Sequence, residues 1–292
     1  MKTPKSILVV VERTAEPSAL IRRAIRLAEP FGARLELFLC DSEQAYVLGH
    51  SYDRHGILAA RNASVSESRR YLSGLRDSAG AGVEMSIDAE CESPLYESVV
   101  RKVLRSAPDI VVKAMGAATA RASGAPDPND WQLMRTCPVT LMLTHARSWR
   151  DAPRLAAAID VSDAEPEDLA KSVMETSVLL AGCSRGELHV VYGEKDPGAD
   201  SRSRRDKLHR LCGEAGVAQD RTHVLSGEPE RTLPAFLREQ GFDALVLGAL
   251  SHRSTGTTPV GTLTSTLLET LDCDFVLVKP VSYRSPIASA KT

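Results

Sequence analysis

Short apolar runs alternate with longer segments of helical periodicity along the whole chain. Apolar runs of about four to eight residues, bounded by turn residues, are typical of buried strands. The first half predicts such strands at residues 7–11, 34–40, 83–89, 109–112 and 138–143. Helices are predicted between them at residues 17–29, 58–79 and 94–106, with a short helix before the last strand. This alternation indicates a parallel sheet with helices on both faces.

The second half repeats that order of elements. Its strands are predicted at residues 155–160, 187–192, 221–225, 243–247 and 275–279, and its main helices at residues 167–181, 202–215 and 229–240. Two local matches support a duplication: PDIVV from Pro108 parallels FDALV from Phe242, and TCPVTLML from Thr136 parallels DCDFVLVK from Asp272. We therefore expect two similar α/β domains in tandem, at residues 1–147 and 153–281, followed by a tail at residues 282–292.

Composition agrees with two globular domains and narrows the class of protein. The 292 residues suit about two domains of ~150 residues each. Lys plus Arg total 36 and Asp plus Glu total 38, so the net charge of −2 offers no positive field for nucleic acid or an anionic membrane. No apolar run approaches the ~20 residues of a membrane span, and none resembles a signal peptide. We expect a cytoplasmic protein.

Several residue types are assigned to structural roles. The six cysteines are far apart, with no CxxC pair, and the seven histidines do not cluster with them. Reduced, inert thiols and no metal site are therefore expected, with Cys137 and Cys273 buried. Trp131 is expected in the core, and the basic residues from Arg202 to Lys207 on a solvated helix face. The polar stretch 41–56 is predicted to be a mobile surface loop.

One segment carries a chemical signature. The string GALSHRSTGTTPVGT starts at Gly248, directly after a predicted strand, and a helix is predicted to begin near Gly261 and Thr262. Small residues let the backbone approach an anion, and the N–H groups at a helix N-terminus point toward it. Thr262 offers a hydroxyl donor or a helix cap. The segment alone is equally compatible with a phosphate loop and with an ordinary flexible loop.

The same segment resembles the nucleotide loop of the universal stress protein family. Gly248, Ser251, Gly261 and Thr262 have the spacing of that family's Gly-x2-Gly-x9-Gly-[Ser/Thr] motif. The ending CDFVLVKP and the triplet at residues 227–229 (GEP) also resemble family members, and PNDWQLMRTCP from Pro128 resembles the tandem, E-type members. The resemblance covers nearly the whole chain up to about Val281.

The resemblance implies a fold and a set of site residues. It implies a flavodoxin-like, adenine-nucleotide-hydrolase-like α/β domain in each half, with a five-stranded parallel sheet of strand order 3-2-1-4-5. Ligands of such sheets lie beyond the carboxyl ends of the strands. It implies ATP, with Mg²⁺, in the second domain. The implied contact residues are Asp160, Val191, Gly248, Ser251, Gly261 and Thr262, with His252 as a loop residue or a phosphate donor at the pocket rim. Asp160 has a structural alternative, because such residues often cap the following turn.

The sequence departs from the family motif in both halves. In the second half Ser251 stands where a glycine is expected, and it adopts a positive φ less freely. In the first half Glu12 matches Asp160, but the glycine positions become Ala114 and Ala125-Pro126. Pro126 has no N–H to donate to a phosphate. No nucleotide is therefore expected in the first domain.

These observations favour a regulatory stress-response protein. It would bind ATP or another adenine nucleotide in the second domain, with little or no turnover and no assigned catalytic residue. Two alternatives stay open: an enzyme that hydrolyses ATP or transfers adenylate, and a nucleotide-free protein that binds a lipid or another hydrophobic ligand. The apolar last strands, at residues 138–143 and 275–279, are predicted to pair as an intramolecular pseudo-dimer. A homodimer is also left open.

Overall fold

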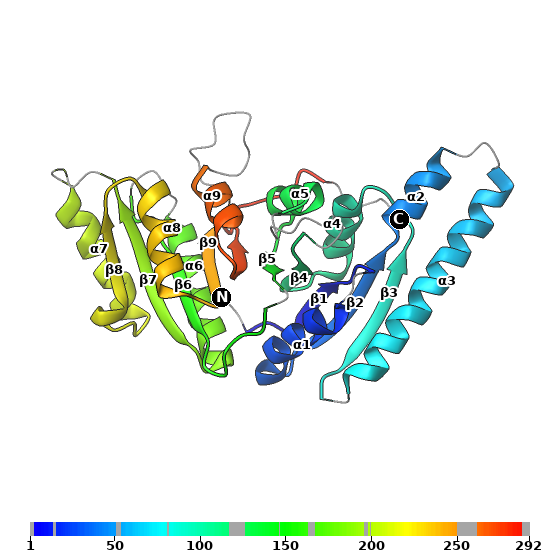
Figure 1. Cartoon of the computed structure of the whole chain (residues 1–292), viewed down its shortest axis with the longest axis horizontal. Helices are drawn as coiled ribbons and strands as arrows, with labels where there is room; N and C mark the ends of the chain where they lie inside the picture. The colour runs from blue at the N-terminus through cyan, green and yellow to red at the C-terminus, as the bar shows by residue number, and fades with distance from the viewer. Residues whose placement is uncertain are drawn as a thin grey trace. The chain divides into compact units, whose positions relative to one another are not determined.

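The structure is a computed structural model that describes residues 3–13, 16–50, 54–80, 82–116, 126–145, 147–162, 167–195, 198, 200–249 and 262–287. These residues divide into two compact units. The first unit holds the described residues from 4 to 145, together with 284–287 from the tail. The second unit holds the described residues from 147 to 283, together with Thr3. The colours of Figure 1 follow the chain through both units.

The first unit contains a parallel sheet of strand order β3-β2-β1-β4-β5. Its strands are β1 (Ser6–Val10), β2 (Arg34–Cys40), β3 (Met85–Glu90), β4 (Ile110–Ala114) and β5 (Thr140–Thr144). Its helices are α1 (Pro17–Ala28), η1 (Glu29–Phe31), α2 (Ser42–Gly49), α3 (Arg54–Ala79), α4 (Leu95–Ser106) and α5 (Pro128–Thr136). Helix α1 contacts α3, and α4 contacts α5. Right-handed crossovers place these two pairs on opposite faces of the sheet.

The second unit contains the same arrangement, with strand order β8-β7-β6-β9-β10. Its strands are β6 (Arg154–Ala158), β7 (Glu187–Glu194), β8 (Thr222–Ser226), β9 (Ala244–Gly248) and β10 (Asp274–Val278). Its helices are α6 (Glu167–Ser184), α7 (Ser201–Glu214), η2 (Gln219–Arg221), α8 (Pro229–Gln240) and α9 (Thr262–Thr270). The predicted α/β class and the strand order 3-2-1-4-5 are confirmed in each unit.

The central strand of the first unit shows why continuous apolar runs predicted the sheet correctly. Ile7, Leu8, Val9 and Val10 in β1 are all nearly inaccessible to solvent, so both faces of the strand are covered. A strand buried on both faces has no polar side and shows no alternation. Helix α8 matches its predicted bounds because Pro229 starts it and Gly241, at a φ of +63°, ends it.

An aspartate in the same place in each unit supports the duplication. The Asp109 carboxylate accepts hydrogen bonds from the backbone N–H groups of Lys5 (2.6 Å) and Ser6 (3.0 Å), where β1 begins. The Asp243 carboxylate accepts one from the N–H of Arg154 (2.9 Å), where β6 begins. Each aspartate therefore ties the start of a unit's first strand to the segment before its fourth.

The prediction of a mobile loop at residues 41–56 is wrong for most of that stretch. Residues 42–49 form α2, and the Asp41 side chain caps it by accepting a hydrogen bond from the Gln44 N–H (3.1 Å). Ala45 and Leu48 are buried against Cys91, beside residues of α3. This burial stabilises a helix whose own sequence shows little amphipathic pattern. Helix α3 also begins earlier than predicted, at Arg54, and residues 51–53 lie outside the described residues.

Three smaller expectations have mixed outcomes. All six cysteines are free, and five are buried, Cys137 and Cys273 among them. Burial raises the pKa of the Cys273 thiol to about 12, so this group stays protonated and unreactive. Trp131 is only half-buried, and its neighbours Leu133 and Met134 fill the core instead. No helix in the described part of the chain is long and apolar enough to cross a membrane.

Candidate functional site

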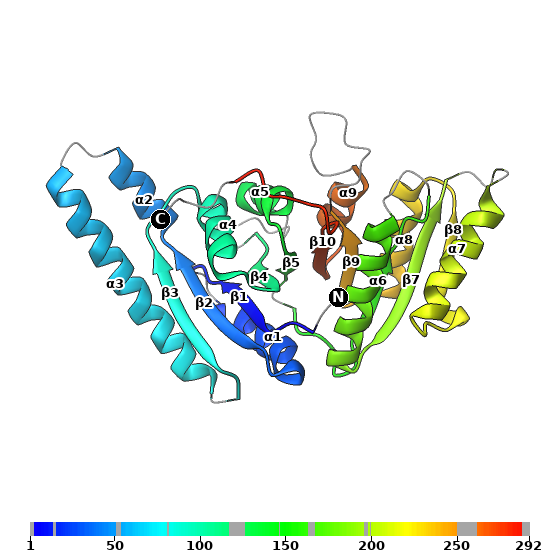
Figure 2. The same ribbon diagram turned by 180° about the vertical axis from the view of Figure 1, so that it is seen from behind.

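Three residues implied by the resemblance lie near the carboxyl edge of the second sheet. Asp160 follows β6 by two residues, and the N–H of Ile159 donates to the carbonyl oxygen of Val191 (3.0 Å). Gly248 is the last residue of β9, which pairs with β6. The strands β6 and β9 therefore end side by side, while the neighbouring β7 continues to Glu194. Figure 2 shows β7 and β9 from behind. This edge is where parallel α/β sheets bind ligands.

Asp160 makes the turn contact that its structural alternative describes. Its Oδ1 accepts a hydrogen bond from the N–H of Ser162 (2.8 Å), which closes a short turn after β6. The side chain is half-buried. Val191 as a whole is 1% exposed, and it lies inside β7, which continues to Glu194.

Gly248 has a packing role of its own. A Cβ atom added there would lie 2.8 Å from Cδ2 of Leu169, which projects from α6. Carbon atoms do not approach so closely without a shift of the surrounding structure. A side chain at residue 248 would therefore force the Leu169 side chain to move away from the end of β9. The glycine is needed for this contact whether or not a phosphate approaches the same backbone.

The remaining predicted site residues fall mostly outside the described residues. Ser251, His252 and Gly261 belong to the segment 250–261, which the structure does not describe. Thr262 is the first residue of α9. The predicted helix start after the loop is thus found, and the loop itself stays a prediction.

A buried ion pair at the end of β7 was missed by the sequence analysis. The Glu194 side chain is 1% exposed, and its Oε2 accepts hydrogen bonds from Nη2 (2.7 Å) and Nε (3.2 Å) of Arg205. Burial raises the pKa of Glu194, but the hydrogen bonds from Arg205 outweigh it, so the net pKa is lowered. Arg205 therefore does not lie on a purely solvated helix face, as we had expected for the basic residues of α7. The pair anchors α7 to the sheet.

The equivalent edge of the first sheet holds a cluster of buried charges. Lys113, the fourth residue of β4, is fully buried. Its Nζ lies 2.7 Å from Oε2 of Glu12 and 2.8 Å from Oδ1 of Asp130, and it donates to the carbonyl oxygen of Ala114 (3.0 Å). Glu12 follows β1 by two residues, and Asp130 lies in the first turn of α5. Three separate elements therefore contribute one charge each.

The second oxygen of Asp130 is also fully engaged. Its Oδ2 accepts hydrogen bonds from the N–H groups of Gly116 (3.0 Å) and Asp127 (3.1 Å). Asp127 in turn accepts the N–H of Asp130 at Oδ1 (2.7 Å), which completes a capping box at the start of α5. The Asp130 side chain is 0% exposed.

Burial and charge act against each other in this cluster. Burial lowers the pKa of Lys113, but the nearby carboxylates of Asp130 and Glu12 outweigh it, and the net pKa is raised. Burial also raises the pKa of Glu12, and Lys113 offsets this only in part. Lys113 is therefore charged at neutral pH, and Glu12 takes up a proton more readily than a solvated carboxylate.

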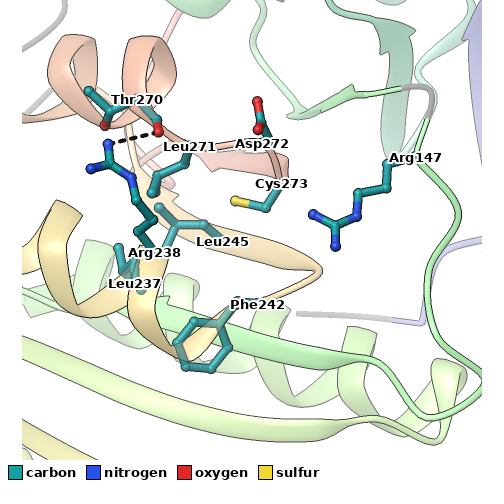
Figure 3. Close-up of a pocket in the computed structure, with 10 residues that line it drawn as sticks. Arg147, Leu237, Arg238, Phe242, Leu245, Thr270, Leu271, Asp272 and Cys273 are labelled. Carbon is teal, nitrogen blue, oxygen red and sulfur yellow. Dashed lines mark hydrogen bonds between the residues drawn. The ribbon is translucent and has the colours of Figure 1, made fainter.

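The described pocket lies at the opposite edge of the second sheet. Gly241 and Phe242 precede β9, Asp272 and Cys273 precede β10, and these residues line a cavity of about 160 Å³ (Figure 3). Arg238 at its rim donates to the carbonyl oxygen of Thr270 (3.1 Å), the last residue of α9. The arginine thus donates a hydrogen bond to a carbonyl group at the C-terminus of α9. This cavity is distinct from the carboxyl edge where the nucleotide is predicted.

The described residues contain no group of three or more His, Cys, Asp or Glu side chains arranged to hold a metal ion. At the second carboxyl edge, the described carboxylates Asp160, Glu194 and Glu228 each already have a partner. A Mg²⁺ ion at this edge would therefore be held mainly by the phosphates that it accompanies.

Comparisons with known proteins agree with this fold. Residues 135–279 match the model of the Universal stress protein family. The chain is 23% identical to universal stress protein E of Escherichia coli over 311 aligned positions, covering 97% of this chain and 96% of the relative.

Two solved structures share the fold. One is a functionally unknown protein from Pseudomonas aeruginosa, with a TM-score of 0.74 at 20% identity, covering 95% of this chain and 93% of that one. The other is a universal stress protein from Archaeoglobus fulgidus, with a TM-score of 0.66 at 14% identity, covering 96% and 97%. The duplicated sheets, the full-length match to an E-type relative and the family model lead to one conclusion: the chain belongs to the universal stress protein family, as a tandem member similar to universal stress protein E.

Proposed function

We propose that this protein is a regulatory stress-response protein that binds an adenine nucleotide in its second unit only. The ligand would be ATP with Mg²⁺, at the carboxyl edge of β6, β7 and β9. Asp160 and Val191 would lie beside the adenosine. Gly248, Ser251, His252, Gly261 and Thr262 would form the ribose and phosphate loop.

One contrast between the two units carries this proposal. Counting from Asp109 and Asp243, which differ by 243 − 109 = 134, residue 247 occupies the place of Lys113. That residue is Leu247, an apolar side chain in β9. Counting from Cys137 and Cys273, which differ by 273 − 137 = 136, Thr266 occupies the place of Asp130. The second unit therefore lacks the internal ion cluster that fills the edge of the first.

The described carboxylates at this edge of the second sheet also support low ATP turnover. Hydrolysis of a bound phosphate needs a positioned water, a metal ion and a group that stabilises the transferred charge. Asp160 accepts a hydrogen bond in a turn, Glu194 is bound by Arg205 and Glu228 pairs with Lys195, so each of these carboxylates already has a partner and is poorly placed to act as a base. We therefore expect binding without rapid chemistry.

Calorimetric titration of the full chain with ATP and Mg²⁺ tests the proposal. Gly261→Asp should abolish binding, because the new side chain fills the loop and adds a like charge. Ala125→Asp is the matched control at the corresponding place in the first half, and it should leave the affinity unchanged. Equal loss of binding in both variants, or no ATP binding by the parent protein, would contradict the proposal.

Two further measurements separate the alternative functions. Mass spectrometry of the denatured, purified protein would identify a bound nucleotide or, for the hydrophobic-ligand alternative, a lipid. Metal-dependent ATP turnover on the order of 1 s⁻¹ that disappears with Gly261→Asp would favour an enzyme instead.

A further inference from the structure

The cavity in front of β9 and β10 combines an apolar interior with two arginine side chains. Its buried apolar lining consists of Leu237, Phe242, Leu245, Leu271 and the Cys273 thiol. Arg147 and Arg238 also line it, and Figure 3 shows them on opposite sides, with Leu245 and Cys273 between them. An apolar interior with a few charged groups that fix the orientation of a ligand is typical of small-molecule sites.

The volume of the cavity suits a single aromatic ring. It measures about 160 Å³, close to the ~150 Å³ of an apolar cavity engineered in another protein that binds benzene. A long acyl chain would extend beyond a space of this size. An adenine nucleotide, with its two-ring base, ribose and phosphates, is also too large to be enclosed. The cavity therefore selects a small ligand of a different class from the nucleotide.

Arg238 keeps donors for a ligand after it has bound the end of α9. Its Nη2 donates to the carbonyl oxygen of Thr270 (3.1 Å), and the described residues offer it no other hydrogen bond or ion pair. A guanidinium group has five N–H donors in a planar fork. A carboxylate accepts two parallel hydrogen bonds from such a fork. A carboxylate can therefore bind Arg238 without breaking the contact with α9.

The charged groups around the cavity favour a ligand with one negative charge. Arg147, Arg238 and Asp272 together leave a formal excess of one positive charge. The Cys273 thiol adds no charge, because burial raises its pKa to about 12. A single carboxylate balances this excess. A phosphate dianion would exceed it and would be repelled more strongly by Asp272.

We propose that this cavity binds a small aromatic monocarboxylate, an acid of the benzoate class. The ring packs against Phe242 and Leu245, and the carboxylate is held at the rim by Arg147 and Arg238. The cavity precedes β9 and β10, whereas the nucleotide is proposed at the opposite edge of the same sheet. The inference therefore does not depend on nucleotide binding.

Fluorine NMR of 4-fluorobenzoate tests the site in the full-length chain. At neutral pH and constant ionic strength, the probe should bind with a dissociation constant on the order of 1 mM or below, and unlabelled benzoate should displace it. Benzyl alcohol lacks the charge and acetate lacks the ring, so each should compete at least about tenfold less well than benzoate. Gly261→Asp, which removes the proposed nucleotide loop, should leave probe binding unchanged.

Charge variants of the rim locate the bound carboxylate. Arg147→Gln and Arg238→Gln should each weaken binding at least about tenfold. Arg231→Gln is the matched control, because Arg231 is an exposed arginine of the same helix, α8, that does not line the cavity. Asp272→Asn should tighten binding about twofold or more, a gain that a folding defect cannot produce.

Four results would overturn the proposal. The first is a probe signal that does not saturate below about 10 mM. The second is competition by acetate or benzyl alcohol as effective as that by benzoate. The third is parent affinity in either cavity arginine variant, or an equal loss in the Arg231→Gln control. The fourth is an Asp272→Asn protein that binds the probe no more tightly than the parent.

Discussion

Replacing Lys113 with methionine should strongly destabilise the first unit. The change keeps a long side chain but removes the ammonium group that lies 2.7 Å from Glu12 and 2.8 Å from Asp130. Two carboxylates are then left beside each other in a site where Lys113 and Asp130 are fully buried. Removing one partner of a buried ion pair costs about 3–5 kcal/mol, because the remaining charge is uncompensated.

The loss should depend on pH with a definite sign. Burial already raises the pKa of Glu12, and loss of Lys113 removes the group that lowers it, so this pKa rises further. A carboxyl group with a raised folded-state pKa favours the folded state at low pH, and this contribution is lost as the pH rises through that pKa. The Lys113→Met protein should therefore recover part of its stability when the pH is lowered from 8 toward 5.

Urea unfolding followed by Trp131 emission measures this effect, in a protein with Trp149→Phe. Leu247→Met is the matched control in the second unit, followed by Trp149 emission in a protein with Trp131→Phe, where a volume-conserving apolar change should cost less than about 1.5 kcal/mol. A loss below about 1 kcal/mol for Lys113→Met would refute the reasoning. A loss of the same size at pH 5 and pH 8 would show that lost packing, and not uncompensated charge, is responsible.

Three further outcomes are expected. Burial lowers the pKa of both His189 and His223, whose ring nitrogens lie 3.1 Å apart. Below pH ~6.5 the unfolded chain binds more protons at these residues, so the free energy of unfolding of the second unit should fall by up to about 1.4 kcal/mol per pH unit for each proton taken up. His223→Gln should reduce this pH dependence in urea unfolding followed by Trp149 emission. Gly248→Ala should cost about 1–3 kcal/mol because its Cβ would meet Leu169, and Leu169→Ala in the same protein should recover part of the loss measured by thermal unfolding. The double change Leu141→Lys with Leu277→Lys should break the predicted pairing of the two last strands. The radius of gyration measured by X-ray scattering should then increase. An unchanged radius in a folded protein would contradict the pseudo-dimer.

Most of the fold could be predicted because a buried parallel strand can be recognised from its own short run of apolar residues. Strand β2 matches its predicted range at residues 34–40, since five of its seven residues are apolar and buried and Asp41 directly follows it. Helix α2 could not be predicted in this way. The helix is stabilised because Ala45 and Leu48 pack against Cys91 from a distant segment of the chain. The sequence of α2 has no periodic pattern that would predict this contact.

The candidate sites also differ in whether local sequence could predict them. The spacing from Gly248 to Thr262 is a local signal, and it predicted the start of α9 correctly. The ion cluster of the first unit depends on three elements that are far apart in the chain. A lysine directly after the apolar run 110–112 was the available signal, because a charge at the end of a buried strand needs a partner. Which carboxylates supply that partner is decided by tertiary structure.

The aspartates that hold the first strand of each unit also constrain how the protein is made. The contacts from Asp109 to Lys5 and Ser6 span 104 and 103 residues, and the contact from Asp243 to Arg154 spans 89. A ribosome must therefore synthesise most of each unit before these hydrogen bonds can form, since they join residues far apart in the chain. During translation, β1 can pair with β2 early, but it lacks the hydrogen bonds to Asp109 until residue 109 has left the exit tunnel. The first unit can then close while the second is still being synthesised, so the two sheets mature in succession.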